Sequence, residues 1–175
     1  PLRDDLPMAT YVLVHGGGHG GWCYQRVARR LRAAGHEVHA PSLTGLGDRA
    51  HLLGPHVDLH PHAPAVAALI LSKALRDVIL VGHSFAGSVV SALADRLPGK
   101  LRHLVYLDAQ VLQSGQAPAD TAPPAAIETY KQRAQASGYL SIPPGPLAFF
   151  GIVEPAMVEW VAARVTPHPY QTYFD

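Results

Sequence analysis

The chain has little cysteine, little charge and no long apolar run, and each shortage argues against a class of protein. Cys23 is the single cysteine of 175 residues, so it cannot form an internal disulfide, and a reducing, cytoplasmic location is expected. Lysine and arginine total 14 against 13 acidic residues, which predicts neither nucleic acid nor an anionic membrane as a partner. The longest apolar run, residues 65–71, is too short to cross a bilayer, and residues 1–7 hold acids and prolines without the apolar core of a signal peptide.

What the chain does contain is a regular alternation of two hydrophobic patterns. With 48% hydrophobic residues, its length suits one domain with a sizeable core. Short β-branched runs predict strands at residues 11–14, 37–40, 78–81 and 101–107, and helical spacing predicts helices at 24–34, 65–75 and 87–97. Strands that alternate with helices of this length predict an α/β fold with a parallel sheet, whose ligands bind at the carboxyl ends of the strands.

The most informative stretch joins the third of these strands to the helix that follows it. Ser84 lies in the turn between them, flanked at two residues' distance by Gly82 and Ala86. A catalytic serine must stand clear of the sheet beside N–H donors, and a sharp strand-to-helix turn with small flanking residues provides this. Cys23 is the weaker candidate nucleophile, because a cysteine between Trp22 and a tyrosine at a helix start is usually a packed small hydrophobe.

A glycine-rich loop follows the first strand, at residues 15–22. Three consecutive glycines let the backbone point its N–H groups at a ligand above the sheet, as an oxyanion hole requires. The same loop could be taken for a dinucleotide-binding motif, but that motif requires an acidic residue at the end of the next strand. The next strand ends instead in Pro41 and Ser42, so no cofactor is expected.

Four histidines, His51, His56, His60 and His62, fall close together after the second strand. Their spacing matches no closed zinc pattern, and neither a cysteine nor a pair of acids accompanies them. We therefore predict no metal site and expect these side chains to lie in a solvated loop and helix entry.

The glycine loop and the serine turn together resemble a known family. Residues 12–22 (VLVHGGGHGGW) and 81–87 (VGHSFAG) are similar to the α/β-hydrolase superfamily. Within it they most resemble the group that contains plant methyl esterases, salicylate-binding esterases, hydroxynitrile lyases and bacterial relatives. Further similarity lies at residues 32–38, 43–49 and 104–108, and the resemblance is good over residues 11–115 and looser beyond.

This resemblance implies roles for individual residues. Ser84 matches the nucleophile, and the backbone N–H groups of Phe85 and Gly17 match the oxyanion donors. His15 and His19 match histidines that hold the loop. In the hydroxynitrile lyases a threonine that binds the substrate hydroxyl stands where this chain has Gly16, which favours ester hydrolysis over cyanohydrin cleavage.

The resemblance also divides the chain. Residues 1–110 are expected to form the N-terminal part of the hydrolase core, and residues 111–170 resemble a helical cap over the serine, with helices at 127–136 and 154–165. Phe149, Phe150 and Trp160 are expected to pack this cap onto the core, and the apolar cap residues to line an acyl or alcohol pocket. The remaining core strands are expected to be absent from this sequence, with a second polypeptide or a dimer partner as one way to complete the sheet.

In this family the nucleophile is followed along the chain by an acid and then a histidine. The resemblance places both beyond residue 175. Asp108 and His168 occur in the right order to form a substitute triad with Ser84, but no predicted strand fixes His168, and Asp108 is expected rather to hydrogen-bond the cap junction.

Three functional hypotheses therefore remain. The favoured one is a serine hydrolase that cleaves small apolar carboxylic esters through an acyl-enzyme on Ser84. The others are a hydroxynitrile lyase-like lyase and a non-catalytic ligand-binding or truncated hydrolase. Without the distal base, the 175 residues alone are expected to hydrolyse esters feebly or not at all.

Overall fold

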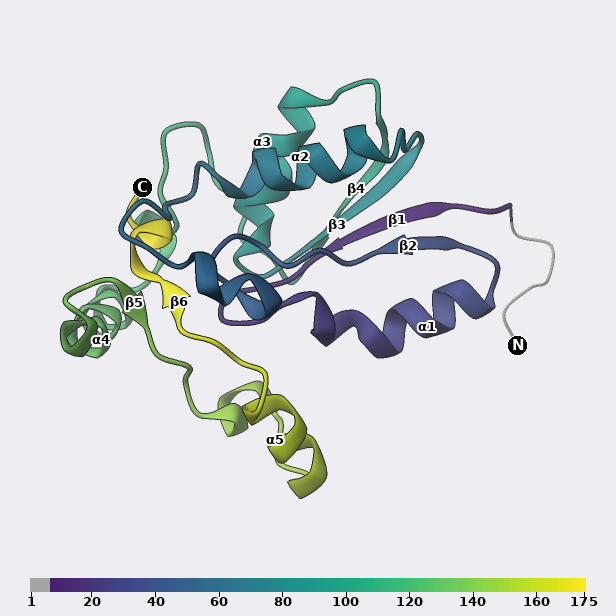
Figure 1. Cartoon of the computed structure of the whole chain (residues 1–175). Coiled ribbons are helices and arrows are strands. Elements are labelled where there is room, and N and C mark those ends of the chain that lie inside the picture. The colour runs from purple at the N-terminus through teal and green to yellow at the C-terminus, as the bar shows by residue number, and fades with distance from the viewer. Residues whose placement is uncertain (1–6) are drawn as a thin grey trace.

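The computed structural model describes residues 7–175, and its elements alternate as the sequence predicts (Figure 1). The prediction made for residues 1–7 falls almost entirely outside this range. The strands are β1 Thr10–Val14, β2 Glu37–His39, β3 Val78–His83, β4 Leu101–Leu107, β5 Ser141–Ile142 and β6 His168–Pro169. The α-helices are α1 Gln25–Ala33, α2 His62–Ser72, α3 Ala86–Arg96, α4 Pro124–Ala134 and α5 Pro155–Ala162. Short 3-10 turns are η1 Gly21–Tyr24, η2 Gly47–Leu52, η3 Pro118–Thr121, η4 Gln135–Ser137, η5 Leu147–Phe150 and η6 Tyr170–Tyr173.

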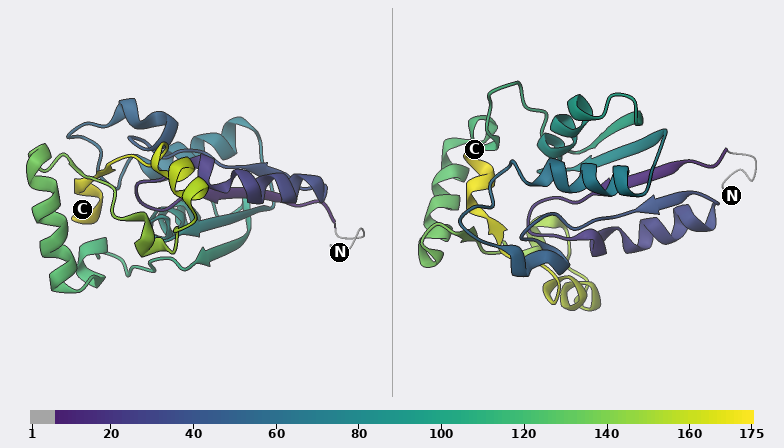
Figure 2. Two further views of the ribbon diagram at one scale, coloured as in Figure 1. Left: turned by 90° about the horizontal axis from the view of Figure 1, so that it is seen from below. Right: turned by 45° about the horizontal axis from the view of Figure 1, so that its top comes forward.

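Four of the strands form a parallel sheet in the order β2-β1-β3-β4. In its centre Thr10 pairs with Val78 and Val14 with Gly82, so β1 and β3 end side by side. Helices cover both faces: α2 and α3 lie on one, and α1 lies on the other (Figures 1 and 2). The predicted α/β fold with a parallel sheet and flanking helices is confirmed.

The larger core lies between the sheet and α2 and α3. Alternate strand residues such as Val12 and Leu80 meet Ile70 of α2 and Leu93 of α3, and all four are 0% exposed. A smaller core lies under α1, where the Tyr24 hydroxyl donates a hydrogen bond of 3.1 Å to the carbonyl of Val14. Both cores reach the ends of β1 and β3, and so they fix the positions from which the glycine loop and the serine turn begin.

The two faces of β3 and β4 are covered unequally. The side chains of β3 alternate between buried and half-buried, whereas the sequence predicts a fully buried strand. Along β4 the contrast is stronger, with Val105 38% and Leu107 50% exposed. The reason is that α1 covers β1 and β2, while β4 is the edge strand of the sheet.

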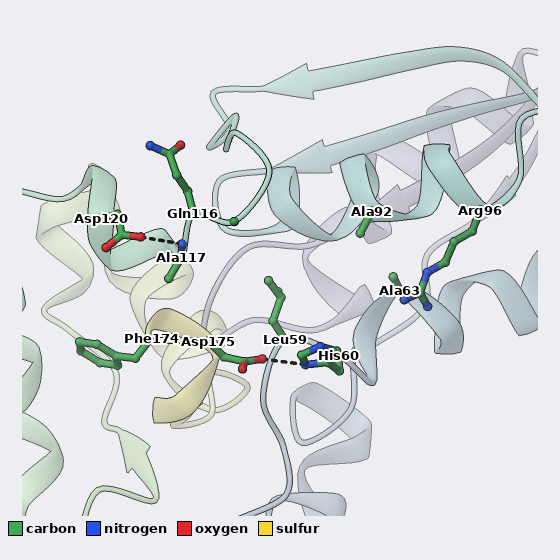
Figure 3. A pocket seen from close by; sticks show the side chains of 11 residues that line it. Leu59, His60, Ala63, Ala92, Arg96, Gln116, Ala117, Asp120, Phe174 and Asp175 are labelled. Carbon is green, nitrogen blue, oxygen red and sulfur yellow. Dashed lines mark hydrogen bonds and ion pairs between the residues drawn. The ribbon is translucent and has the colours of Figure 1, made fainter.

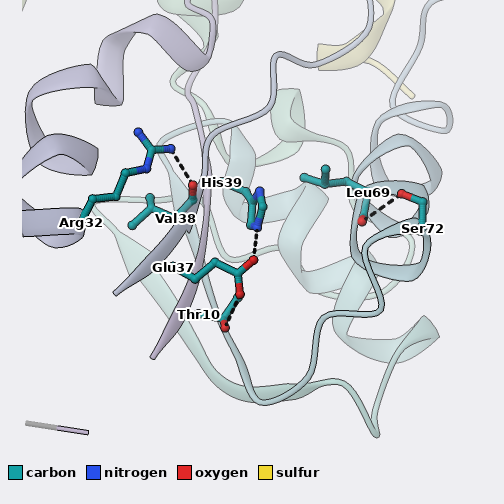
Figure 4. A network of polar contacts seen from close by, with 7 residues as sticks. All are labelled: Thr10, Arg32, Glu37, Val38, His39, Leu69 and Ser72. Carbon is teal, nitrogen blue, oxygen red and sulfur yellow. Dashed lines mark hydrogen bonds and ion pairs between the residues drawn. The ribbon is translucent and has the colours of Figure 1, made fainter. Parts of the chain in front are cut away.

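A polar network ties the other edge strand, β2, to its neighbours (Figure 4). The Glu37 carboxylate accepts hydrogen bonds from the Thr10 hydroxyl at 3.1 Å and from His39 at 2.9 Å, and the Arg32 guanidinium donates to the carbonyl of Val38 at 2.6 Å. Hydrogen bonding to His39 and Thr10 lowers the pKa of Glu37. Two of these contacts are partly buried and the one between His39 and Glu37 is exposed, so they help to fix the short strand but add little stability.

The segment after β4 lies toward the carboxyl ends of the parallel strands (Figure 1). Its strands β5 and β6 pair antiparallel, a pairing that the sequence did not indicate. Trp160 of α5 meets Trp22 edge to face at 5.3 Å, and Phe150 meets His19 at 6.1 Å, so both attach this segment to the glycine loop as expected. Phe149 instead is 85% exposed. Within residues 7–175, no helix is long and apolar enough to cross a membrane.

Candidate active site

Ser84 lies at the junction between β3 and α3, in a backbone conformation that side-chain-bearing residues seldom adopt. Its φ is +54°, in the left-handed region. Its N–H donates to the carbonyl of Leu107 at 3.3 Å, and its carbonyl accepts from the N–H groups of Gly87 at 3.1 Å and Gln110 at 3.0 Å. The strain is thus held by the neighbouring strand and the segment that follows it, which is the arrangement of a nucleophile elbow.

The residues around the serine are small because backbone and side chains approach closely there. A Cβ at Gly82 would lie 2.7 Å from a methyl group of Val90, and Ala86 is 0% exposed. A Cβ at Gly87 would lie only 1.9 Å from the carbonyl oxygen of Gln110. Gly87 is therefore the tightest position of the turn, a constraint that sequence reasoning missed because Gln110 is distant along the chain.

The glycine loop lies directly against the serine. A Cβ at Gly16 would lie 3.1 Å from Ser84 Cβ and 3.0 Å from His83 Nδ1, so any larger side chain would press directly on the serine and on His83. Within residues 7–175, the N–H groups of Gly17 and Phe85 donate no hydrogen bond. Two free donors beside a serine at an elbow are what an oxyanion hole requires.

Two side chains link these two donor residues. The Phe85 ring, 2% exposed, lies 4.6 Å from the ring of His168 and 5.9 Å from that of Tyr173. A Cβ at Gly17 would lie 3.3 Å from His168 Nδ1 and 3.0 Å from the Tyr173 hydroxyl. Gly17 and the Phe85 ring therefore both lie against His168 and Tyr173.

His15 and His19 hold the glycine loop, as the family resemblance implies. His15 Nδ1 donates to the carbonyl of Gly16 at 2.8 Å, and its Nε2 accepts from the N–H of Leu43 at 3.0 Å. His19 Nδ1 lies 2.8 Å from the carbonyl of Gly17, and the His19 ring stacks on Trp22. With both nitrogens of His15 engaged, that ring is a support for the loop and is not available as a base.

His168 is also engaged on both sides of its ring. Its Nδ1 accepts from the N–H of Gly18 at 3.2 Å, and its Nε2 bonds the Thr172 hydroxyl at 2.7 Å. Since that hydroxyl donates to the carbonyl of Pro169, Nε2 carries the proton. The expectation that no strand fixes His168 was wrong, because β6 pairs with β5 and buries the ring.

Asp108 lies at the carboxyl end of β4, with its carboxylate exposed and its φ at +44°. Within residues 7–175 that carboxylate makes no hydrogen bond, so the expected bond to the cap junction is missing. The structure places Gly17 and His168 near Phe85, the residue after Ser84, but no hydrogen bond within the same range joins Ser84 Oγ to His168 or Asp108.

The four clustered histidines divide into two kinds. His51, His56 and His60 are exposed as expected, but His62 is fully buried, which contradicts the solvated reading. Its ring lies 5.8 Å from that of Phe85 in a T-shaped arrangement, and neither ring nitrogen has a hydrogen-bond partner within residues 7–175. Tertiary packing beneath the serine turn, which no local pattern shows, decides this position.

Burial gives the site a predictable response to acid. Desolvation is the main cause that lowers the pKa of both His15 and His62 to about 4, from an ordinary value of 6.5. As the pH falls, these two histidines are therefore protonated in the unfolded chain before they are protonated in the folded protein. The stability they contribute is complete above pH 6.5 and is lost as the pH falls from there to about 4.

We expect the free energy of unfolding to fall by about 2 kcal/mol per buried histidine between pH 7 and pH 5. Urea unfolding at the two pH values measures the fall. His62→Leu, which breaks no hydrogen bond, should remove one histidine's share of it. If the free energy of unfolding fell equally in the parent and in His62→Leu, the lowered pKa of buried His62 would be contradicted.

His60 gathers two carboxylates that the sequence did not associate with it. Its Nδ1 lies 2.8 Å from Asp175 Oδ2 and 3.5 Å from Asp58 Oδ1, at the edge of a cavity of about 500 Å³ (Figure 3). The three potential ligand atoms lie within 4.8 Å of one another. The His60 side chain is 76% exposed, so this is a surface ion-pair cluster worth about 1 kcal/mol or less.

Cys23 packs at the edge of the smaller core, and burial raises the pKa of its thiol to about 12. The thiolate is therefore negligible at neutral pH, as expected for a packed residue.

Comparison with known proteins agrees with this geometry. Residues 11–175 match the "Alpha/beta hydrolase family". The chain is 41% identical to a "Carbendazim hydrolyzing esterase" of Nocardioides sp. (strain SG-4G) over 95% of this chain and 72% of that protein. It is also 41% identical to a "Pyrethroid hydrolase" of Sphingobium wenxiniae over 65% of this chain and 40% of that protein.

Among solved structures, the chain is similar to an "Extracellular alpha/beta-hydrolase from Paenibacillus species". The TM-score is 0.86 at 29% identity, over 97% of this chain and 70% of that one. That Paenibacillus protein shares structural and functional homology with Tobacco Salicylic Acid Binding Protein 2. The elbow, the glycine loop and these matches agree: the chain belongs to the alpha/beta hydrolase family.

Proposed function

We propose that this protein is a serine carboxylesterase that acts on small esters, with Ser84 as its nucleophile and the N–H groups of Gly17 and Phe85 as its oxyanion hole. The observation that carries the proposal is the left-handed Ser84 at the elbow, with Gly16 against its Cβ and two free donors beside it. The named relatives, which include the carbendazim esterase and a "Methyl jasmonate esterase 1" of Vitis vinifera, support ester substrates.

In this reaction the Ser84 oxygen bonds to the ester carbonyl carbon and loses its proton to a general base. The carbonyl oxygen becomes negatively charged, and the two N–H groups stabilise it. The alcohol then leaves with the proton, and a water molecule hydrolyses the acyl-enzyme to release the acid and free Ser84. Gly16 argues against the lyase alternative, because a glycine at this position provides no hydroxyl to bind that of a cyanohydrin substrate.

The base is the part that the described residues do not supply. No hydrogen bond within residues 7–175 joins Ser84 Oγ to a histidine, and the matched relatives extend beyond the part that this chain covers. We propose that a histidine oriented by an acid, both outside the described residues, completes the site, either from the same protein or from a partner polypeptide beside β4.

The remaining assignments are proposals of the same kind. Residues 1–110 would be the hydrolase core and residues 111–170 the cap, because the latter lie at the carboxyl ends of the strands and contact the glycine loop. A cytoplasmic location rests on the single cysteine alone.

The test of this function is detection of the acyl-enzyme. The chain is mixed with p-nitrophenyl acetate and imidazole, a diffusible substitute for the base, quenched in acid and examined by peptide mass spectrometry. One added acetyl group on the peptide that contains Ser84 is the expected result. Acetylation confined to lysines or the N-terminus would overturn the proposal.

A further inference from the structure

A cavity of about 400 Å³ separates the glycine loop from α4 and the loops that follow it. Its lining includes Gly17, Tyr130, Arg133, Phe150 and Tyr173. Gly17, one of the two proposed oxyanion donors, lines this cavity together with His168, although Ser84 and Phe85 do not line it. The larger cavity in Figure 3 is lined by none of these four residues. The smaller cavity is therefore the place that a substrate held at the Gly17 N–H would extend into.

Arg133, near the end of α4, is the single acidic or basic side chain other than histidine among the described residues that line this cavity. Its guanidinium donates to the carbonyl of Pro143 and lies against Gly145, where a Cβ would be 3.7 Å from both terminal nitrogens. A guanidinium has five N–H donors, so one bond to a carbonyl leaves others for a ligand. No carboxylate of a described lining residue neutralises it.

Tyr173 connects Arg133 to the proposed catalytic groups. Its hydroxyl lies 3.0 Å from the position of a Cβ on Gly17. Burial raises the pKa of this phenol and Tyr130 adds to the rise, while the charge of Arg133 acts in the opposite direction. Gly17, Tyr173 and Arg133 all line the same cavity, so a ligand in that cavity can contact both the oxyanion loop and the guanidinium.

The wall of this cavity is rich in aromatic rings. Tyr130 and Tyr173 pack on each other with ring centroids 5.0 Å apart, and the prolines on either side of Gly145 provide a stiff apolar lip. A flat aromatic ring can stack against such aromatic surfaces, which an aliphatic chain cannot do.

We infer that this cavity binds an aromatic ester that carries a carboxylate, with the ester carbonyl directed to Gly17 and the carboxylate bound by Arg133. This inference rests on the proposed function and names its substrate class. The carboxylate gains charge-assisted hydrogen bonds from the guanidinium, which a neutral ester of the same shape cannot make.

The experiment compares the binding of methyl 4-carboxybenzoate and methyl benzoate to the 175-residue chain by calorimetry at pH 7. We expect the carboxylate ester to bind about tenfold more tightly. Arg133→Met, which keeps the aliphatic stem, should reduce this ratio to about one without weakening methyl benzoate, and Arg133→Lys should retain part of it. The matched control Arg96→Met removes an arginine from the larger cavity and should leave the ratio unchanged.

A second measurement does not depend on the variants. Added salt should weaken the binding of methyl 4-carboxybenzoate and leave the binding of methyl benzoate unaffected. Equal affinities for the two esters, or a ratio that survives both salt and Arg133→Met, would overturn the inference. Failure of the esterase proposal would show separately, as carboxylate binding without acetylation of Ser84.

Discussion

Replacing Ser84 with alanine is expected to reduce the imidazole-assisted hydrolysis of p-nitrophenyl acetate to the rate of imidazole alone, a loss of a hundredfold or more. The Ser84 oxygen is the atom that forms the bond to the acyl group. The two N–H donors can stabilise negative charge, but they cannot form that bond. The measurement is the initial rate over a range of imidazole concentrations, with the enzyme-free blank subtracted.

Stability should hardly change in Ser84→Ala, because alanine has the same difficulty with a φ of +54° and the side chain makes no hydrogen bond within residues 7–175. Ser72→Ala is the matched control, since the Ser72 hydroxyl donates only to the carbonyl of Leu69 near the end of α2 (Figure 4). A Ser84→Ala variant that retains the parental rate would remove the serine from the mechanism.

Gly87→Ala is expected to destabilise the fold by about 3 kcal/mol, the upper end of the cost of overpacking. Helix propensity alone predicts the opposite sign, because alanine is favoured over glycine by about 1 kcal/mol inside a helix. The steric effect dominates, since the new Cβ would lie 1.9 Å from the carbonyl oxygen of Gln110, a backbone atom that cannot rotate away. Urea unfolding at pH 7 measures the difference.

Gly99→Ala is the control for this change. Gly99 lies just before β4, and a Cβ there would meet nothing within 4 Å. The unfolding midpoint of Gly99→Ala should therefore stay close to that of the parent protein. If Gly87→Ala were as stable as Gly99→Ala, the close approach between α3 and the segment after β4 would be wrong, and with it the bond from Gln110 that holds Ser84.

Much of the core could be predicted because its signals are local. The strand at residues 78–81, the turn at Ser84 and the helix that follows are encoded by apolar runs, small residues and helical spacing, and the structure has β3 and α3 there. The ends of the helices were predicted less accurately. α2 begins at His62, three residues before the predicted start, because prolines fit the first turn of a helix and do not by themselves mark a loop.

The errors concern residues whose surroundings come from distant parts of the chain. His62 was predicted to be solvated, yet Phe85 covers it, and no periodicity connects those two positions. No strand was predicted to support His168, yet the two-residue strands Ser141–Ile142 and His168–Pro169 pair with each other in the segment after β4. Runs this short are below what strand patterns can detect.

The proline-rich lip of the cavity around Gly145 has a consequence for how ligands would be chosen. Proline removes backbone freedom before any ligand arrives, so little ordering remains to oppose association. A rigid wall of this kind discriminates between ligands by their shape, because it cannot move to accommodate a ligand that does not fit. The range of esters that the cavity binds would therefore be changed by substituting those prolines. Ser84 and the two proposed oxyanion donors would not need to change.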